Sequence, residues 1–209
     1  MSMPDTLRQR VLQAAATEAV PTRLAWRRQA LVAIVVAAVA SLGLFECAGG
    51  AEHGKARPGN LTLWIALGGS LLAVIATWLA HHRGRSMLGR PMVQSVAVAV
   101  LAPVATAAWM VAFADLYTAP APKFGWRCLG LSLAMTTPLL IAGWRYGRPQ
   151  FGYAQRWQGA AIGGAAAAWA AVLVQIWCPL CDLPHVLVGH ALPVALAVLV
   201  GALLAGKRI

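Results

Sequence analysis

The residues best suited to chemistry lie together in the stretch 177–190, which reads Trp-Cys-Pro-Leu-Cys-Asp-Leu-Pro-His-Val-Leu-Val-Gly-His. It contains two cysteines, an aspartate and two histidines, in a chain that is otherwise dominated by Ala, Val, Leu and Gly. Thiolate and imidazole groups bind zinc and copper(I), and closely spaced thiols can also form a disulfide or exchange one. We therefore place the candidate chemistry of the protein in this stretch.

Three interpretations of the stretch remain open. Cys178 and Cys181 can form a structural disulfide, with each other or with Cys47 or Cys128. The Cys-Pro-Leu-Cys pair can instead be redox-active, because a neighbouring imidazole lowers the pKa of a thiol. The third interpretation is a zinc or copper site with two thiolate and two imidazole ligands. Its ligands would be Cys178, Cys181, His185 and His190.

A helix is predicted to begin within the stretch and to carry both histidines. Pro184 suits the first turn of that helix, with Asp182 or Leu183 near its cap. In a regular α-helix His190 lies roughly 7 Å beyond His185 and points about 140° away from it around the axis. The two histidines are therefore predicted not to share a face.

The composition determines the class of protein that must position these residues. Of the 209 residues 60% are hydrophobic and only 11% are charged, and the mean hydropathy is +0.68. A water-soluble domain of this length needs a more polar surface. The net charge of +11 does not indicate nucleic-acid binding, since the basic residues lie in the gaps between apolar runs. The chain is predicted to be an integral membrane protein.

The apolar runs predict an all-α, polytopic bundle of six transmembrane helices with a short cytoplasmic N-terminal amphipathic helix. The predicted spans are 31–47, 61–80, 92–114, 128–144, 158–177 and 186–205. The fifth span contains Gly159-Ala-Ala-Ile-Gly163, whose small residues allow a neighbouring helix to approach closely. We expect that neighbour to belong to the same chain rather than to a second copy.

The distribution of basic residues predicts the orientation of the bundle. Thirteen of the 17 Lys and Arg residues fall on the side of the two termini, which by the positive-inside rule is the cytoplasm. The same topology puts every cysteine at the outer interface, which in a bacterium borders the oxidising periplasm. His53, His81 and His82 are interpreted as solvated loop residues. The candidate redox or sensor residues are Cys47, Cys128, Cys178 and Cys181.

The segment 1–28 is the only sizeable polar part of the chain. Leu7, Val11 and Leu12 recur at helical spacing, with Arg8 and Arg10 between them. A helix of about fifteen residues is marginal alone in water. It therefore needs a partner, for which a protein and the anionic membrane surface are both candidates.

Two short motifs and the layout of the spans resemble a known family. The first motif is Pro-Asp-x-Leu-Arg-x-Arg-Val-Leu, from Pro4 to Leu12, and the second is Cys-x-x-x-Asp-x-Pro-His-x-x-x-x-His, from Cys178 to His190. Together with six short spans they resemble the NrsF family over nearly the whole chain. The resemblance implies a bacterial inner-membrane anti-sigma factor that holds an extracytoplasmic-function (ECF) sigma factor at the membrane.

The residues themselves limit how a sigma factor could be held. The segment 1–28 has no cysteine and is too short for a zinc-type anti-sigma domain. Contact must then use the short helix, with Leu7, Val11 and Leu12 in a groove of the partner. The nearby Arg8 and Arg10 would complement acidic patches. We therefore predict a cytoplasmic sigma-binding segment, 1–28, and a transmembrane domain, 29–209, that together form a regulator rather than an enzyme.

Two other functions remain as alternatives. A membrane thiol-disulfide oxidoreductase would use Cys178 and Cys181, although Cys47 and Cys128 form no second Cys-x-x-Cys pair. A metal-binding membrane protein would use the same two cysteines. The sequence predicts no direct contact with nucleic acid, and it leaves the oligomeric state, the stimulus and the particular sigma factor open.

Overall fold

The computed structural model describes residues 23–50, 59–81, 92–112, 125–146, 154–180 and 182–206, together with Gln9 and Gln13. The chain divides into two units, Met1–Ala33 and Ile34–Ile209. Over the described ranges the regular structure is entirely helical. The predicted N-terminal helix and its residues Leu7, Arg8, Arg10, Val11 and Leu12 lie outside these ranges.

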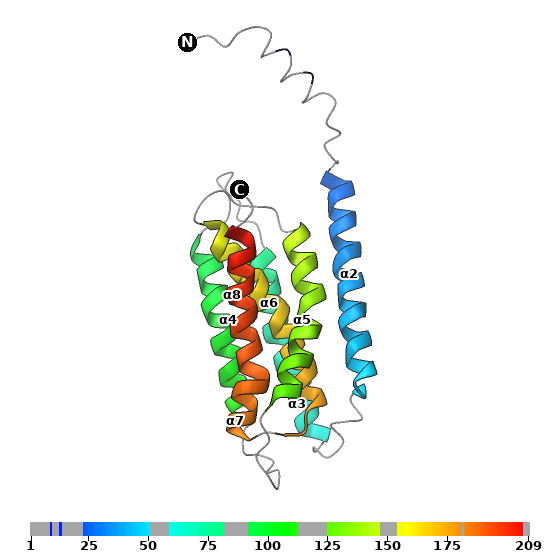
Figure 1. Ribbon diagram of the computed structural model, residues 1–209, viewed down its shortest axis with the longest axis vertical. Helices are drawn as coiled ribbons and strands as arrows, with labels where there is room; N and C mark the ends of the chain where they lie inside the picture. Colours follow the sequence, from blue (N-terminus) through cyan, green and yellow to red (C-terminus); the bar gives the residue numbers. More distant parts are fainter. Residues whose placement is uncertain are drawn as a thin grey trace. The chain divides into compact units, whose positions relative to one another are not determined.

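Six helical segments correspond to the six predicted spans (Figure 1). They are α2 (Arg23–Cys47), α3 (Gly59–His81), α4 (Met92–Ala112), α5 (Trp126–Tyr146), α6 (Ala154–Trp177) and a last segment in three parts, α7 (Leu183–Val186), the π-helix η2 (Leu187–Ala191) and α8 (Leu192–Gly206). The prediction of an all-α polytopic bundle is confirmed. The division of the last span into three parts was not predicted.

Five of these segments are long and apolar enough to cross a membrane, judged by length and composition over the described residues. The sixth, α5, is 21 residues long and more polar, because it contains arginines near both ends and three hydroxyl side chains between them. Thr136 and Thr137 satisfy their hydroxyls within the helix by donating to the carbonyls of Ser132 and Leu133, at 2.7 Å each. Such internal bonding lets a helix carry hydroxyls in an apolar environment.

Helix α6 is the central element of the bundle. It contacts α3, α4, α5 and α8. Of the residues in its most apolar stretch, 83% are buried inside the protein. A Cβ atom added to Gly159 would collide with the carbonyl oxygen of Gly201, and one added to Gly163 would collide with that of Ala197. The small residues of α6 thus bring α8 into backbone contact, which confirms the predicted packing of this motif within the chain.

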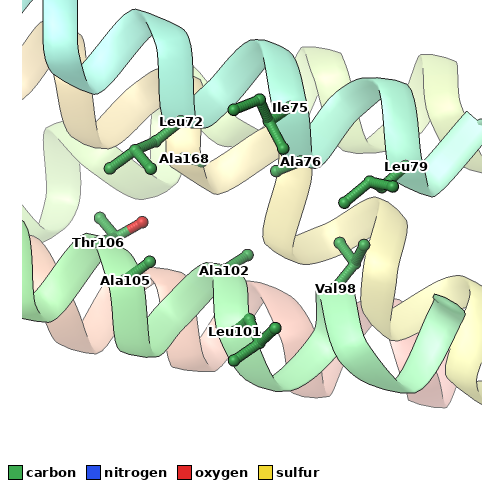
Figure 2. A pocket seen from close by; sticks show the side chains of 10 residues that line it. All are labelled: Leu72, Ile75, Ala76, Leu79, Val98, Leu101, Ala102, Ala105, Thr106 and Ala168. Carbon is green, nitrogen blue, oxygen red and sulfur yellow. The ribbon is translucent and has the colours of Figure 1, made fainter. Parts of the chain in front are cut away.

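An apolar pocket of about 210 Å³ lies between α3 and α4 (Figure 2), with Ala168 of α6 among its lining residues. Its lining is hydrocarbon except for the hydroxyl of Thr106. A specific ligand site needs several convergent polar groups to orient its ligand. The pocket therefore offers no comparable chemistry, and the polar site lies elsewhere in the bundle.

Candidate functional site: a buried cluster of two cysteines and two histidines

Three side chains of the stretch 177–190 and one from an earlier helix form one buried cluster. They are Cys128, Cys178, His185 and His190, and one ligand atom from each lies within 4.8 Å of all the others. Cys128 comes from α5, Cys178 directly follows α6, His185 lies in α7 and His190 in η2. We call these four residues the Cys2His2 cluster.

Two glycines allow α5 and the π-helix to approach closely enough to form the cluster. A Cβ atom on Gly125, which precedes α5, would lie 2.7 Å from both the Cα atom of Gly189 and the carbonyl oxygen of His185. A Cβ atom on Gly189 would lie 2.9 Å from the Cβ atom of Cys128. Larger residues at either position would push Cys128 away from the histidines.

The turn between α6 and α7 is fixed by local hydrogen bonds. The amide of Cys178 donates to the carbonyl of Val174 at 2.8 Å, so Cys178 still lies on the last turn of α6. Asp182 caps α7, since its carboxylate accepts a bond from the amide of His185 at 3.3 Å, and Pro184 lies in the first turn. The predicted cap and proline position are confirmed.

The orientation of His190 differs from the prediction. Between His185 and His190 the chain forms a π-helix, and the amide of Leu192 bonds to the carbonyl of Leu187, five residues earlier. This wider turn brings residues five apart to nearly the same face. The two rings therefore meet edge to face, with centroids 5.5 Å apart. The prediction that the two histidines point about 140° apart was wrong, because it assumed a regular α-helix.

A proline and a serine accompany the π-helix. Pro193, directly after it, has no amide hydrogen to donate to the carbonyl of Gly189. The hydroxyl of Ser132 on α5 supplies a donor to that carbonyl, at 3.3 Å. The irregular backbone is thus satisfied by a side chain of a neighbouring helix, as an apolar environment requires.

The two histidines have different hydrogen bonding. Nε2 of His185 lies 3.3 Å from Sγ of Cys128 and 3.2 Å from Sγ of Cys178. His190 is only 1% exposed, and neither Nδ1 nor Nε2 has a hydrogen-bond partner. Buried polar groups are nearly always bonded, and an exception calls for an explanation such as an absent ion. His190 is therefore the strongest indication that the cluster receives a ligand.

The electrostatics of the cluster favour a thiolate at Cys178. Hydrogen bonding from the thiol of Cys128 lowers the pKa of Cys178 from its usual range, with smaller contributions from the imidazoles of His185 and His190. Burial opposes this shift. A thiolate is the form that binds metal and that reacts in thiol chemistry.

The distances from His185 to the two sulfur atoms are compatible with a single tetrahedral cation, and the other ligand atoms of the cluster lie within 4.8 Å of one another. With zinc–sulfur and zinc–nitrogen distances of about 2.3 and 2.05 Å, the sulfur and nitrogen ligands of one tetrahedral ion lie about 3.5 Å apart. The observed sulfur–nitrogen distances of 3.2 and 3.3 Å need to widen by only a few tenths of an ångström. Two thiolates and two imidazoles suit zinc and copper(I).

The structure describes three of the four predicted metal ligands, Cys178, His185 and His190, and brings all three together. It adds Cys128 as a fourth member of the cluster. Cys181, the fourth predicted ligand and the partner in the proposed Cys-Pro-Leu-Cys pair, lies outside the described residues. Cys47 is exposed at the end of α2 and is not part of the cluster. Among the described cysteines, Cys47, Cys128 and Cys178 form no disulfide.

The fold and the site define a polytopic helical bundle, with five helices long and apolar enough to cross a membrane and a buried thiol–imidazole cluster at one end. The family model described as negative regulator of sigma F, NrsF, matches residues 14–209, so the chain belongs to this family. The predicted family is thereby confirmed. No curated protein and no solved structure matches the chain.

Proposed function

We propose that the chain is an inner-membrane regulator that sequesters an ECF sigma factor through its N-terminal segment and senses its stimulus at the Cys2His2 cluster. The family is that of the negative regulators of sigma F, and this match carries the regulatory part of the proposal. Five apolar helices and the excess of basic residues on the side of both termini support a membrane location with cytoplasmic ends.

The sigma-binding surface is the apolar stripe of the N-terminal helix. Leu7, Val11 and Leu12 would enter a groove of the sigma factor, and Arg8 and Arg10 would face its acidic groups. An amphipathic helix of this kind binds through a few apolar anchors, so charges placed on the stripe remove the main source of affinity.

A reporter gene behind the sigma-dependent promoter tests this surface. The double variant Leu7→Asp, Val11→Asp is expected to release the sigma factor and raise reporter output, while the protein remains in the membrane at wild-type abundance. The matched control is Gln9→Asp with Gln13→Asp, which adds the same charge on the polar side of the helix and should leave repression intact. Full repression by the first variant would refute the assignment of Leu7 and Val11.

The cluster is the proposed sensor, and a soft cation, zinc or copper(I), is its proposed ligand. The observation that supports this is His190, whose two ring nitrogens are buried without a partner beside two thiols and a second imidazole. The cluster also lies at the outer end of the bundle in the predicted topology, where periplasmic metal ions arrive.

A thiol-disulfide oxidoreductase is a poorer fit to the same cluster. Cys128 and Cys178 are each only 2% exposed. Exchange with a substrate disulfide requires access of the attacking sulfur, which this burial denies. A small cation can reach a buried cluster that a protein thiol cannot.

The detergent-purified full-length protein tests the sensor. Zinc, and copper(I) in an anaerobic parallel, should bind at one ion per chain, and Cys128→Ser and Cys178→Ser should each weaken binding by about tenfold or more. Cys47→Ser is the matched control, because Cys47 is exposed and outside the cluster. Equal affinities for all four proteins would refute the assignment.

A further inference from the structure

Helix α2 is attached to the rest of the bundle by one narrow stripe. Between Ile34 and Cys47 only Ala37, Ser41 and Phe45 are buried, and their spacing of four puts them on one face. Of the residues in the most apolar stretch of α2, 17% are buried, whereas the corresponding share in α6 is 83%. Among the described helices, α2 is thus the most lightly packed.

Two residues of the stripe, Ser41 and Phe45, contact residues near the Cys2His2 cluster. The hydroxyl of Ser41 donates to the carbonyl of Met135 on α5 at 2.8 Å, two turns from Cys128. Phe45 belongs to the same buried apolar group as Cys128 and Cys178.

A hydrogen bond links Trp177, which is next to the cluster, to Ala48, which directly follows α2. The indole Nε1 of Trp177 donates to the carbonyl of Ala48 at 2.9 Å. Trp177 directly precedes Cys178, and Ala48 directly follows the last residue of α2. A displacement of Cys178 along the chain is therefore passed to the end of α2 through one side chain.

Helix α6, which ends directly before Cys178, is packed tightly against α8. The contact between α6 and α8 is backbone against backbone at Gly159 and Gly163, and closely packed interfaces do not deform continuously. Helix α2 has few buried residues, so it can move when only the contacts of its stripe change. A change at the cluster should therefore appear as a movement of α2.

We propose that α2 carries the state of the Cys2His2 cluster toward the N-terminal segment, and that Trp177 and Phe45 are the positioning residues that couple α2 to the cluster. This inference rests on the proposed sensor role of the cluster. Cation binding changes the position of Cys178 in the cluster, Trp177 moves with it, and the bond to Ala48 shifts the end of α2. Helix α2 runs from Arg23 to Cys47, so it is the helix that directly follows the N-terminal segment.

Cys47 provides a readout that needs no sigma factor. It is exposed and is the last residue of α2, so its rate of modification by a maleimide reports the surroundings of that helix end. The rate is measured on the full-length protein in detergent, with EDTA or with zinc, and is quantified at Cys47 by peptide mass spectrometry. Zinc is expected to change the wild-type rate by about twofold or more.

The variant Trp177→Phe keeps the aromatic ring and removes the donor to Ala48. It should bind zinc with wild-type affinity and lose the zinc-dependent change at Cys47. Trp64→Phe is the matched control, because Trp64 is an exposed tryptophan of α3, and it should keep the change. A purely structural role of Trp177 would instead lower abundance or zinc affinity.

Three results would overturn the coupling. One is a wild-type protein that binds zinc with no change at Cys47, and another is a Trp177→Phe protein that retains the full change. If zinc does not bind, the proposed ligand is wrong. The coupling is then tested with Cys178→Ser, which alters the cluster without a metal. An unaltered Cys47 rate in Cys178→Ser would overturn the coupling on its own.

Discussion

Replacing His190 by leucine should have opposite effects on the metal-free and metal-loaded protein. Both ring nitrogens of His190 are buried without a hydrogen-bond partner, so the metal-free protein bears the desolvation cost of an unsatisfied group. Leucine has a similar volume and no polar atom. It removes that cost, and it also removes one ligand of the cation.

The two effects are similar in size. An unsatisfied buried polar group costs about 1–3 kcal/mol, so metal-free His190→Leu should be more stable than wild type by up to that amount. A cation at one hundred times its dissociation constant stabilises the folded state by about 2.7 kcal/mol. The wild type should gain this stabilisation with zinc, and the variant should gain little of it.

The assay is thermal unfolding of both proteins in detergent, with EDTA and with zinc. For a chain of this size, each kcal/mol corresponds to about 2–4 °C in the unfolding midpoint. The midpoint of His190→Leu should lie above that of wild type in EDTA and should rise much less with zinc.

His185→Leu provides the matched control for this experiment. His185 hydrogen-bonds to both Cys128 and Cys178, so the same substitution should destabilise the metal-free protein. A metal-free His190→Leu protein that is less stable than wild type, yet is stabilised by zinc as strongly, would refute the argument from the unpaired nitrogens.

Two further predictions concern the site and the topology. Gly189→Ala should weaken zinc binding by about tenfold or more, because its Cβ atom would lie 2.9 Å from that of Cys128. Gly130→Ala, on α5 with nothing within 4 Å of the added atom, should bind as wild type, and equal loss in both would point to general misfolding. Alkaline-phosphatase fusions after Gly54 and Thr118 should be active and fusions after Arg85 and Arg148 inactive, as the positive-inside rule requires; the reverse pattern would put the cluster on the cytoplasmic side.

Much of the fold could be predicted because it depends on local composition. A transmembrane helix needs only a long apolar run, and six such runs can be read directly. The close approach of another helix of the chain to α6 followed from glycines four residues apart, and the cap at Asp182 from the residue types that begin helices; which helix approaches was not predicted. Each of these signals lies within one segment of the chain.

The composition of the cluster could be predicted only in part. Cys178, His185 and His190 are close in sequence, but Cys128 comes from α5, 50 residues before Cys178. Its inclusion depends on which helices are neighbours, and a sequence pattern does not encode this. The only available signal was that the predicted topology put every cysteine at one interface.

The π-helix could not be predicted because it depends on tertiary contacts. The apolar spacing of 183–206 is compatible with a regular α-helix, which would point His190 away from His185. The hydroxyl of Ser132 and the close approach of Gly125 accompany the wider turn, and both residues come from outside the segment. Pro193, which lacks the amide for Gly189, was the one local indication of an irregularity.

Co-purification of the detergent-solubilised wild-type protein with its associated soluble proteins tests the central claim most directly. Mass spectrometry of the eluate should find a sigma factor of the ECF type in nearly equal amount to the regulator, and zinc should reduce that amount for wild type but not for Cys178→Ser. A well-expressed wild-type protein that retains no sigma factor, with or without zinc, would contradict the account.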